Sequence, residues 1–380
     1  MSEALCALDN HRPDWGQSVL PLGQLCGHRL AHDIIAPYNH PASSVSVMDG
    51  YAFKGGGADI SLKLIGESRA GEPFEGELGE GQAVRIFTGA LLPKGADTVE
   101  MQENAVVSGD RVSFSSLSLH RNFVRSAGSD FSKGALLFKQ GARVTPAMIL
   151  TLATCNFETA AVQRLPSVAL LSSGDELRPV GSRLEAGHIV NSISPALTAL
   201  LTHWGVEVYD LGIAKDTAAD ITEKLKDCHA DIIVPIGAAS VGDYDLMQPA
   251  AKALNFKPVF SKVAVKPGKP TWFSKRDQQC ILGLPGNPSS AWVCAQLFLK
   301  HLIFGPQKWE SGKLDSPLAA NGKRESFLRA KQLESGALKP LNRQDSGLVT
   351  PLSDADCLIR RPVNAKALSV NDYAEFMRLD

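Results

Sequence analysis

The sequence predicts a multidomain protein of the α/β and β classes: a doubly wound α/β domain, a β-rich inserted domain and a small C-terminal β domain. Its 380 residues exceed the roughly 100–200 residues of a single domain. Apolar residues make up 44% of the chain and charged residues 21%, which is ordinary globular usage and excludes disorder as the main state. Buried-strand and helical patterns alternate over residues 165–304, and the flanking segments carry short strand-like runs.

Charge and cysteine spacing exclude several classes of protein. Lys and Arg total 39 against 40 for Asp and Glu, a net charge of −1, so no basic field recruits nucleic acid or anionic lipid. No uncharged apolar run approaches the roughly 18 residues of a membrane span. The seven cysteines are scattered and form no C-x-x-C pair, which argues against a disulfide framework or a zinc site. We expect a cytoplasmic protein with no membrane or nucleic-acid partner.

The N-terminal third has mainly β character. From Pro37 to Gly141 the chain is dense in Gly and Pro, and turn residues separate short apolar runs such as 83–87. A helical pattern follows over 146–153. The β-rich segment is therefore expected to be an insertion that projects from a smaller supporting layer.

The middle of the chain predicts a parallel sheet covered on both faces. We expect strands over 168–171, 206–209, 231–234 and 280–282, with helices over 195–204, 217–228, 245–254 and 288–304. Short β runs such as 326–329 and 357–360 follow residue 306. In doubly wound sheets ligands bind beyond the carboxyl ends of the strands. The functional residues should lie in those turns.

Two strand ends carry residues suited to anions and metals. The first strand runs into 172–177, where Ser173 and Asp175 either bind a ligand or cap a turn. The third runs into 237–245, where glycines permit close approach of a phosphate. Asp243 and Asp245 would there face a magnesium ion, and a plain N-cap is the alternative for Asp243.

Two proline-rich turns follow. Lys262, Lys266 and Lys269 lie on a turn stiffened by two prolines around a glycine, which suits a polyanionic ligand or forms a solvated basic turn. Residues 284–288 give a rigid turn into the last helix, with Asn287 as a cap or a ligand donor.

In the β-rich segment, polar residues stand among small ones. Asp49 and Thr88 lie in such loops, as site residues or as ordinary turn residues. Arg125 and Asp130 flank Gly128, where an exposed salt-bridged turn is the alternative.

Taken in order, these motifs resemble the molybdopterin molybdenumtransferase family, the MoeA proteins and the gephyrin E domain. The similarity spans nearly the whole chain. It rests on five ordered segments, which are 48–52, 85–90, 172–177, 266–270 and 283–288.

The resemblance implies four domains. These are a supporting layer (20–36 with 134–163), a β-rich inserted domain (37–133), an α/β molybdopterin-binding domain (1–19 with 164–305) and a C-terminal β domain (306–380).

The family activity implied is insertion of molybdenum. Members take adenylylated molybdopterin and molybdate as substrates, hydrolyse the adenylate with Mg²⁺, release AMP and leave molybdenum on the dithiolene. They act as homodimers, with the site between the α/β domain of one subunit and the β-rich parts of its partner. Molybdopterin adenylyltransferase and molybdoenzyme-maturation proteins are the implied further partners.

The resemblance also implies roles for individual residues. The catalytic set is Asp49, Thr88, Asp130, Glu176, Asp216 and Asp245. The substrate-binding set is Arg125, Ser172, Gly174, Asn191, Gly237, Ser240, Gly242, Lys262, Lys266, Lys269, Pro285, Gly286, Asn287, Arg324 and Ser346. The metal ligands implied are Glu176, Asp243 and Asp245.

Several positions depart from the family pattern. Asn191-Ser192-Ile193 stands for the usual Asp-Ser/Thr-Asn, and the other departures are Phe123 for Asn, Ser129 for Glu, Ala238 for Gly and Asp345 for Gly. An amide at 191 accepts hydrogen bonds but cannot act as a base. Three functions are therefore compared: a molybdenum-inserting enzyme, a catalytically impaired binding or scaffold relative, and a hydrolase that releases AMP without inserting metal.

Overall fold

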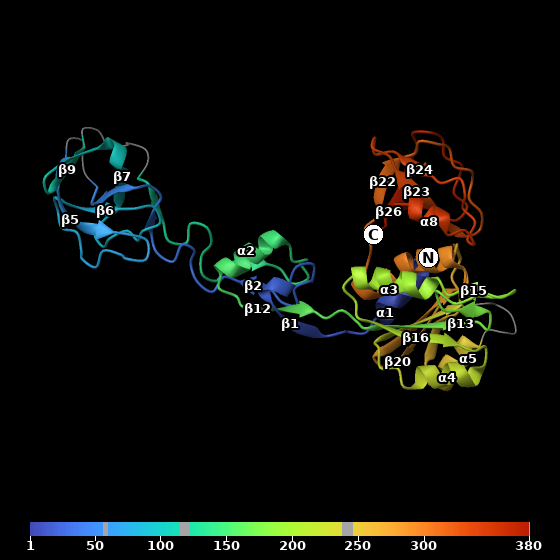
Figure 1. Cartoon of the computed structure of the whole chain (residues 1–380). Helices are drawn as coiled ribbons and strands as arrows, with labels where there is room; N and C mark the ends of the chain where they lie inside the picture. The colour runs from blue at the N-terminus through green and yellow to red at the C-terminus, as the bar shows by residue number, and fades with distance from the viewer. Residues whose placement is uncertain (56–59, 115–121, 238–245, 380) are drawn as a thin grey trace. The chain divides into compact units, whose positions relative to one another are not determined.

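The chain divides into two compact units. A computed structural model describes residues 1–55, 60–114, 122–237 and 246–379. One unit comprises Met1–Gly16 with Arg164–Asp380, and the other comprises Gln17–Gln163 (Figure 1). The boundaries of the four expected domains stay predictions, and the two units are described in turn.

A mixed six-stranded sheet forms the centre of the first unit. Its strand order is β16-β13-β17-β21-β20-β18, in which the first four strands pair in parallel and the last two are antiparallel to their neighbours. The strands are β13 (Val168–Ser173), β16 (Val208–Ala214), β17 (Ile232–Gly237), β18 (Lys257–Phe260), β20 (Trp272–Arg276) and β21 (Gln279–Pro285). A short parallel pair, β14 (Leu177–Arg178) and β15 (Ile189–Val190), follows β13.

Both faces of this sheet are buried because alternate residues of each strand meet helices on opposite sides. Val168 and Leu170 of β13 belong to the core shared with α1, α3, α6 and α7, whereas Ala169 and Leu171 belong to the core shared with α4 and α5. The helices are α1 (Ser2–His11), α3 (Ile193–His203), α4 (Ala218–Lys226), α5 (Met247–Ala253), α6 (Pro288–Cys294) and α7 (Lys300–Phe304), with a π-helical stretch at Ala295–Leu299. This confirms the doubly wound α/β prediction.

The predicted boundaries need two corrections. The second strand was expected over 206–209, but β16 starts two residues later and continues to Ala214. The antiparallel strands β18 and β20 were not predicted. β18 is a short edge strand that contains Pro258 and has no fully buried residue.

The C-terminal part of the first unit is a second sheet, in the order β19-β23-β25-β26-β22, with β24 paired to β23. Its elements are β19 (Val265–Lys266), β22 (Glu310–Lys313), β23 (Glu325–Gln332), β24 (Leu338–Pro340), α8 (Thr350–Asp354), β25 (Cys357–Arg361) and β26 (Tyr373–Arg378). β19 belongs to the turn that carries Lys262, Lys266 and Lys269, called the lysine turn below. Its pairing with β23 connects that turn to the C-terminal sheet.

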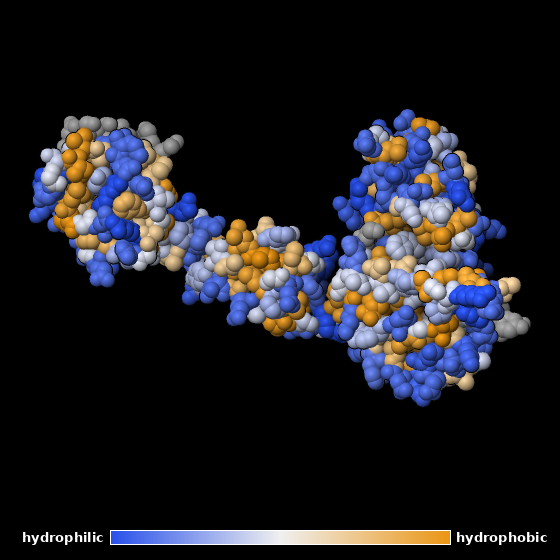
Figure 2. Space-filling view, in the orientation of Figure 1, coloured by the Kyte–Doolittle hydropathy of each residue, from blue (hydrophilic) through white to orange (hydrophobic). Residues whose placement is uncertain are grey.

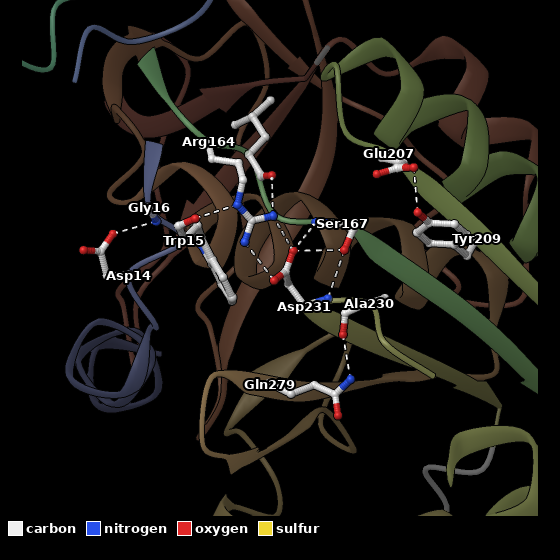
Figure 3. Close-up of polar contacts among 11 residues, drawn as sticks. Asp14, Trp15, Gly16, Arg164, Ser167, Glu207, Tyr209, Ala230, Asp231 and Gln279 are labelled. Atoms are coloured by element: carbon white, nitrogen blue, oxygen red, sulfur yellow. Dashed lines mark hydrogen bonds and ion pairs between the residues drawn. The ribbon is translucent and has the colours of Figure 1, made fainter. Parts of the chain in front are cut away.

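A polar cluster fastens both chain segments that leave the first unit. The Arg164 guanidinium donates two hydrogen bonds to Asp231, at 2.8 and 2.9 Å, and a third to the Trp15 carbonyl at 2.6 Å. Arg164 N also donates to Gly16 O at 3.0 Å. Ser167 binds the same Asp231 carboxylate through its backbone N and its hydroxyl (Figure 3).

The second unit holds a small supporting layer. β1 (Gln17–Pro21) pairs with β12 (Thr159–Gln163), and β2 (Ile34–Ile35) pairs with β11 (Leu136–Phe138). Helix α2 (Pro146–Thr154) is capped by the Thr145 hydroxyl, which accepts from Met148 N at 3.3 Å. Apolar surface covers part of this layer (Figure 2), and Val19 and Leu150 are 66% and 71% exposed.

The β-rich part confirms its predicted class. A six-stranded sheet runs in the order β7-β4-β6-β5-β9-β8, and β3 (Val45–Ser46) pairs separately with β10 (Val124–Arg125). The sheet strands are β4 (Gly50–Phe53), β5 (Ile60–Ser68), β6 (Gln82–Ile86), β7 (Thr98–Met101), β8 (Ala105–Ser108) and β9 (Arg111–Phe114). Short 3₁₀ turns lie at Leu22–Gln24 and Gln102–Asn104. Among the described residues, no helix is long and apolar enough to cross a membrane.

Candidate functional site

Polar side chains gather where β13 and β16 end. Ser173 donates its hydroxyl hydrogen to Asp216 Oδ1 at 2.6 Å. The backbone N of Asp216 in turn donates to Asp175 Oδ1 at 3.2 Å. The Glu176 carboxylate folds over Gly174, because a Cβ built on Gly174 would lie 2.7 Å from it. These contacts place three carboxylates at neighbouring strand ends, as the sequence predicted for this edge.

The adjacent strand ends approach so closely that side chains are excluded. Gly237, at the end of β17, has φ +109°, and a Cβ there would lie 2.7 Å from Ser173 O. A Cβ on Gly286 would lie 3.0 Å from Gly237 Cα, and Pro285 pairs with Gly237 in the sheet. Such a surface of bare backbone lets a ligand come close to amide groups.

Ser172 is a second buried polar residue of this edge, next to Ser173. Its side chain is fully buried, and its Oγ has no hydrogen-bond partner among the residues that the structure describes. The loop after β17 carries Ser240, Gly242, Asp243 and Asp245, and the departure Ala238, all of which lie outside the described residues.

The Asn287 side chain makes a contact with a distant loop and does not cap α6. It stands at the N-cap position of α6, but its side chain makes no capping bond. Its Nδ2 instead donates to Ser346 Oγ at 3.4 Å. Two predicted substrate-binding residues, 59 positions apart, are thus neighbours.

Asn191 is buried at the start of α3. Its backbone N donates to Arg178 O at 2.8 Å, and its Oδ1 accepts from Ser194 N at 3.5 Å. The amide therefore helps to cap the helix, a role that the family's aspartate could fill equally well.

The lysine turn is closed and held beside a strand. Val263 N donates to Lys269 O at 3.0 Å, which brings the two ends of the turn together. Parallel pairing of β19 with β23 places Lys266 opposite Ser326, two residues from Arg324. Lys262, Lys266, Lys269 and Arg324 are all exposed. Four cations therefore share one turn and the strand end beside it, an arrangement suited to a polyanion.

In the second unit, Asp49 and Thr88 are joined across 39 residues. Asp49 Oδ1 accepts from the Thr88 backbone N at 2.8 Å and from its hydroxyl at 2.9 Å. These two hydrogen bonds hold the pKa of Asp49 below its ordinary value. The pair is therefore a specific contact between two loops and not two independent turn residues.

Arg125 and Asp130 face a common cavity. The structure records no ion pair between them, so the salt-bridged turn is not found. Instead, both line a cavity of about 320 Å³ together with His40, Pro41 and Ser129. The His40 ring, which the sequence analysis missed, stacks on Phe131 at a centroid distance of 5.3 Å. Phe123 is buried with φ +47°, a left-handed conformation that asparagine adopts more readily.

Arg329 is a second residue that the sequence analysis missed. It is 2% exposed, and its guanidinium donates to Ser289 Oγ at 2.6 Å and to the carbonyls of Arg343, Asp345 and Leu348 at 3.0–3.2 Å. It thereby fixes the loop that carries Ser346. Its partners lie 14 to 40 residues away, so no local pattern could have identified it.

The site residues fall into two sets. The first unit contains the strand-end carboxylates, the closely approaching Gly237 and Gly286, the Asn287–Ser346 pair and the lysine turn. The second unit brings Asp49 to Thr88 and, separately, Arg125 to Asp130. Among the described residues, no three His, Cys, Asp or Glu side chains are grouped so as to hold a metal ion. Of the proposed metal ligands, only Glu176 is described.

Three protein-family models match the chain. The MoeA N-terminal region (domain I and II) matches residues 1–156. A probable molybdopterin binding domain matches residues 169–304, and the MoeA C-terminal region (domain IV) matches residues 311–379. The three matches together span nearly the whole chain.

Curated relatives and solved structures agree with these models. The molybdopterin molybdenumtransferase of Haemophilus influenzae is 36% identical over 77% of this chain and 74% of its own length. The protein of that name from Staphylococcus aureus is 30% identical over 99% of this chain and 94% of its own. A molybdopterin biosynthesis MoeA structure from Pyrococcus horikoshii has a TM-score of 0.88 at 27% identity, covering 99% of this chain and 98% of that one.

Proposed function

Because this chain belongs to the MoeA family, we propose that it acts in molybdenum cofactor biosynthesis as a molybdopterin molybdenumtransferase. In this proposal it takes adenylylated molybdopterin and molybdate, transfers molybdenum to the dithiolene and releases AMP. The curated relatives carry the name molybdopterin molybdenumtransferase. The adenylylated form of the substrate and the release of AMP are part of our proposal.

One observation carries the proposal. The ends of β13, β16 and β17 combine acceptor carboxylates with a glycine surface that has no side chains. In an open α/β sheet this edge is where ligands bind. Charged acceptors beside accessible backbone amides suit a reaction on a phosphate ester.

The chemistry divides between cations and carboxylates. Lys262, Lys266, Lys269 and Arg324 hold the anionic phosphate and molybdate groups. Hydrolysis of the adenylate breaks a P–O bond and removes a proton from the attacking water. Asp216 and Glu176 are the described carboxylates at this edge that can accept that proton.

Magnesium remains a proposal with three assigned ligands. Glu176 carries an exposed carboxylate, which suits a hard cation, and Asp243 and Asp245 are the other two. An Mg²⁺ ion held by these carboxylates would supply positive charge beside the phosphate groups of the substrate.

We further propose a cytoplasmic homodimer, with each site completed by the partner's β-rich part. The exposed apolar side chains of the supporting layer, such as Val19 and Leu150, support an interface. All seven cysteines are free thiols, which fits a reducing compartment. Molybdopterin adenylyltransferase and molybdoenzyme-maturation proteins are the proposed transient partners.

A second candidate function is a catalytically impaired relative that binds molybdopterin. It is favoured by Asn191, whose neutral amide stands where the resemblance implies a carboxylate. Phe123, Ser129 and Ile193 add further departures.

The test compares two aspartates four residues apart. Asp216→Asn keeps an oxygen that accepts from the Ser173 hydroxyl but removes the negative charge and the ability to take up a proton, and we expect AMP release to fall roughly 100-fold or more. Asp220→Asn is the matched control, because within the described part of the chain the Asp220 carboxylate accepts only from Lys215 N, at the start of α4. Equal rates of AMP release in Asp216→Asn and the parent would contradict the proposed role.

A further inference from the structure

The first unit holds a cavity whose lining residues come from the start of α3, from α6 and from α8. Its volume is about 370 Å³. The lining residues are Ser192, Ile193, Ala196, Leu197, Pro288, Trp292, Val349, Leu352 and Ser353. None of the nine is charged, and most are apolar. The part of a ligand that enters this cavity is therefore uncharged.

The lining has the chemistry of a ring-binding site. The Trp292 indole and the Pro288 ring offer flat apolar faces, and the Ser192 and Ser353 hydroxyls supply polar contacts. Small-molecule sites combine apolar walls with a few polar groups in this way, and their volumes are about 300–1,000 Å³. A volume near the lower end of that range suits one ring system better than a whole nucleotide-like substrate.

Hydrogen bonds from Arg329 hold the two walls of the cavity in position. Arg329 donates to Ser289 Oγ, next to Pro288, and to Leu348 O, next to Val349. The same guanidinium therefore fastens α6 on one wall and the start of α8 on the other. A cavity built on such contacts is preformed, so that little ordering entropy is lost on binding.

The cavity adjoins residues already assigned to the substrate. Ser192 follows Asn191, and Pro288 follows Asn287, whose amide contacts Ser346. In the proposed function, the lysine turn, which pairs with β23 at Lys266, binds the charged phosphates of the substrate. The uncharged ring of the same substrate then needs an apolar place nearby.

We propose that this cavity binds a flat bicyclic heteroaromatic ring of the substrate. The inference rests on the proposed function, whose substrate carries two such rings, a pterin and an adenine. Trp292 and Pro288 contact the ring faces, and the two serine hydroxyls bond its edge.

The experiment fills the cavity and measures binding at equilibrium. Ala196→Trp places a large side chain in the cavity from α3, and Ala199→Trp makes the same change on the same helix at an exposed position outside the lining. The probes are AMP for the adenine and 6-hydroxymethylpterin for the pterin, titrated calorimetrically into the full-length protein. We expect Ala196→Trp to weaken one probe roughly tenfold or more and Ala199→Trp to leave both unchanged.

The two probes identify the ring. Loss of AMP binding alone assigns the adenine, and loss of pterin binding alone assigns the pterin. The inference is overturned if neither probe binds the parent, or if Ala196→Trp binds both as the parent does. Quenching of Trp292 fluorescence by the bound probe, absent in Trp292→Phe, is a second expected result.

Failure of this inference is distinct from failure of the proposed function. A parent that binds a probe but neither releases AMP nor retains molybdenum contradicts the function and keeps the cavity as a ring site. A parent that inserts molybdenum, and whose Ala196→Trp form keeps the same KM, contradicts the cavity alone.

Discussion

At the residue scale, Asp49 receives both of its donors from one residue. The Thr88 N–H and hydroxyl lie 2.8 and 2.9 Å from the same carboxylate oxygen. Both bonds favour the charged form, which is why the pKa of Asp49 is lowered. We expect Thr88→Val to raise that pKa, because it removes the hydroxyl donor and leaves the N–H. A carboxyl NMR titration measures the change.

The sign of the pH effect follows from that direction. A carboxyl whose pKa is lower in the folded chain stabilises the fold above its ordinary pKa. That contribution disappears as the pH falls through the folded-state pKa. Thr88→Ser keeps a hydroxyl donor and is the control. An unchanged Asp49 pKa in Thr88→Val would show that the hydroxyl bond does not form in solution.

Asn191 decides how far the family's chemistry applies to this chain. Its Oδ1 accepts from Ser194 N, a bond that an aspartate oxygen makes equally well at a helix N-terminus. We expect Asn191→Asp to fold normally and to release AMP faster. Its dependence on Mg²⁺ should be steeper, because the new carboxylate adds like-charge repulsion. The measurement is initial AMP release over a range of Mg²⁺ concentrations.

A control separates catalysis from folding at this position. Asn191→Ala loses the capping bond, and its free energy of unfolding should fall by about 1 kcal/mol. Should Asn191→Asp leave a robust parental rate unchanged, the departure at 191 has no catalytic consequence.

The sequence predicts these residues unevenly. The ordered motifs predict roles for Asp49 and Thr88, and the family resemblance adds Asp216, but the partners of all three are set by contacts between distant segments. The alternative readings of Asn287 illustrate this, because only the loop held by Arg329 brings Ser346 to it. A buried arginine that bonds carbonyls leaves no periodic pattern in the sequence.

At the element scale, the strongly periodic segments were predicted correctly and the weakly patterned ones were not. β13 and β17 are continuous buried runs, so their apolar sequences identify them. β19 is only Val265–Lys266, and it exists because a prolyl turn pairs with a strand 60 residues later. Such a pairing depends on tertiary structure and not on local propensity.

The pair of Arg164 and Asp231 fixes where the chain leaves the first unit (Figure 3). Burial raises the pKa of Asp231, but the hydrogen bonds from Arg164 and Ser167 outweigh it and leave the pKa lowered. We expect Asp231→Asn to reduce the free energy of unfolding by about 1–2 kcal/mol, since the pair is only partly buried. Denaturant unfolding of the parent and the variant measures the difference.

The same experiment has a pH arm and a matched control. Because the folded-state pKa is lowered, the difference between parent and Asp231→Asn should shrink as the medium becomes acidic. Glu207→Gln alters an exposed contact with Tyr209 and should change stability by no more than about 0.5 kcal/mol. Equal losses of unfolding free energy in the two variants would mean that the Arg164–Asp231 pair stabilises the fold no more than an exposed contact does.

At the scale of the whole molecule, the proposed catalytic residues are divided between two compact units. Asp49 belongs to Gln17–Gln163, and Asp216 belongs to the other unit. If each site of the proposed homodimer takes one unit from each chain, then a dimer of an Asp49→Ala chain and an Asp216→Ala chain has one intact site. Random mixing of equal amounts predicts about a quarter of the parental AMP release.

The result can be interpreted only if the two variant chains exchange subunits and form mixed dimers. Two differently tagged chains, purified through both tags, isolate the mixed dimer and should show about half the parental rate. Complete absence of activity in this purified mixed dimer would place Asp49 and Asp216 in the site of the same chain.

The central claim is that this chain couples AMP release to retention of molybdenum. The direct measurement incubates the full-length parent with adenylylated molybdopterin, molybdate and Mg²⁺, and quantifies AMP and pterin-bound molybdenum in the same sample. We expect both products to appear together, in equal amounts and only when molybdate and Mg²⁺ are both present. AMP release without retained molybdenum, or bound substrate with neither product, would contradict it.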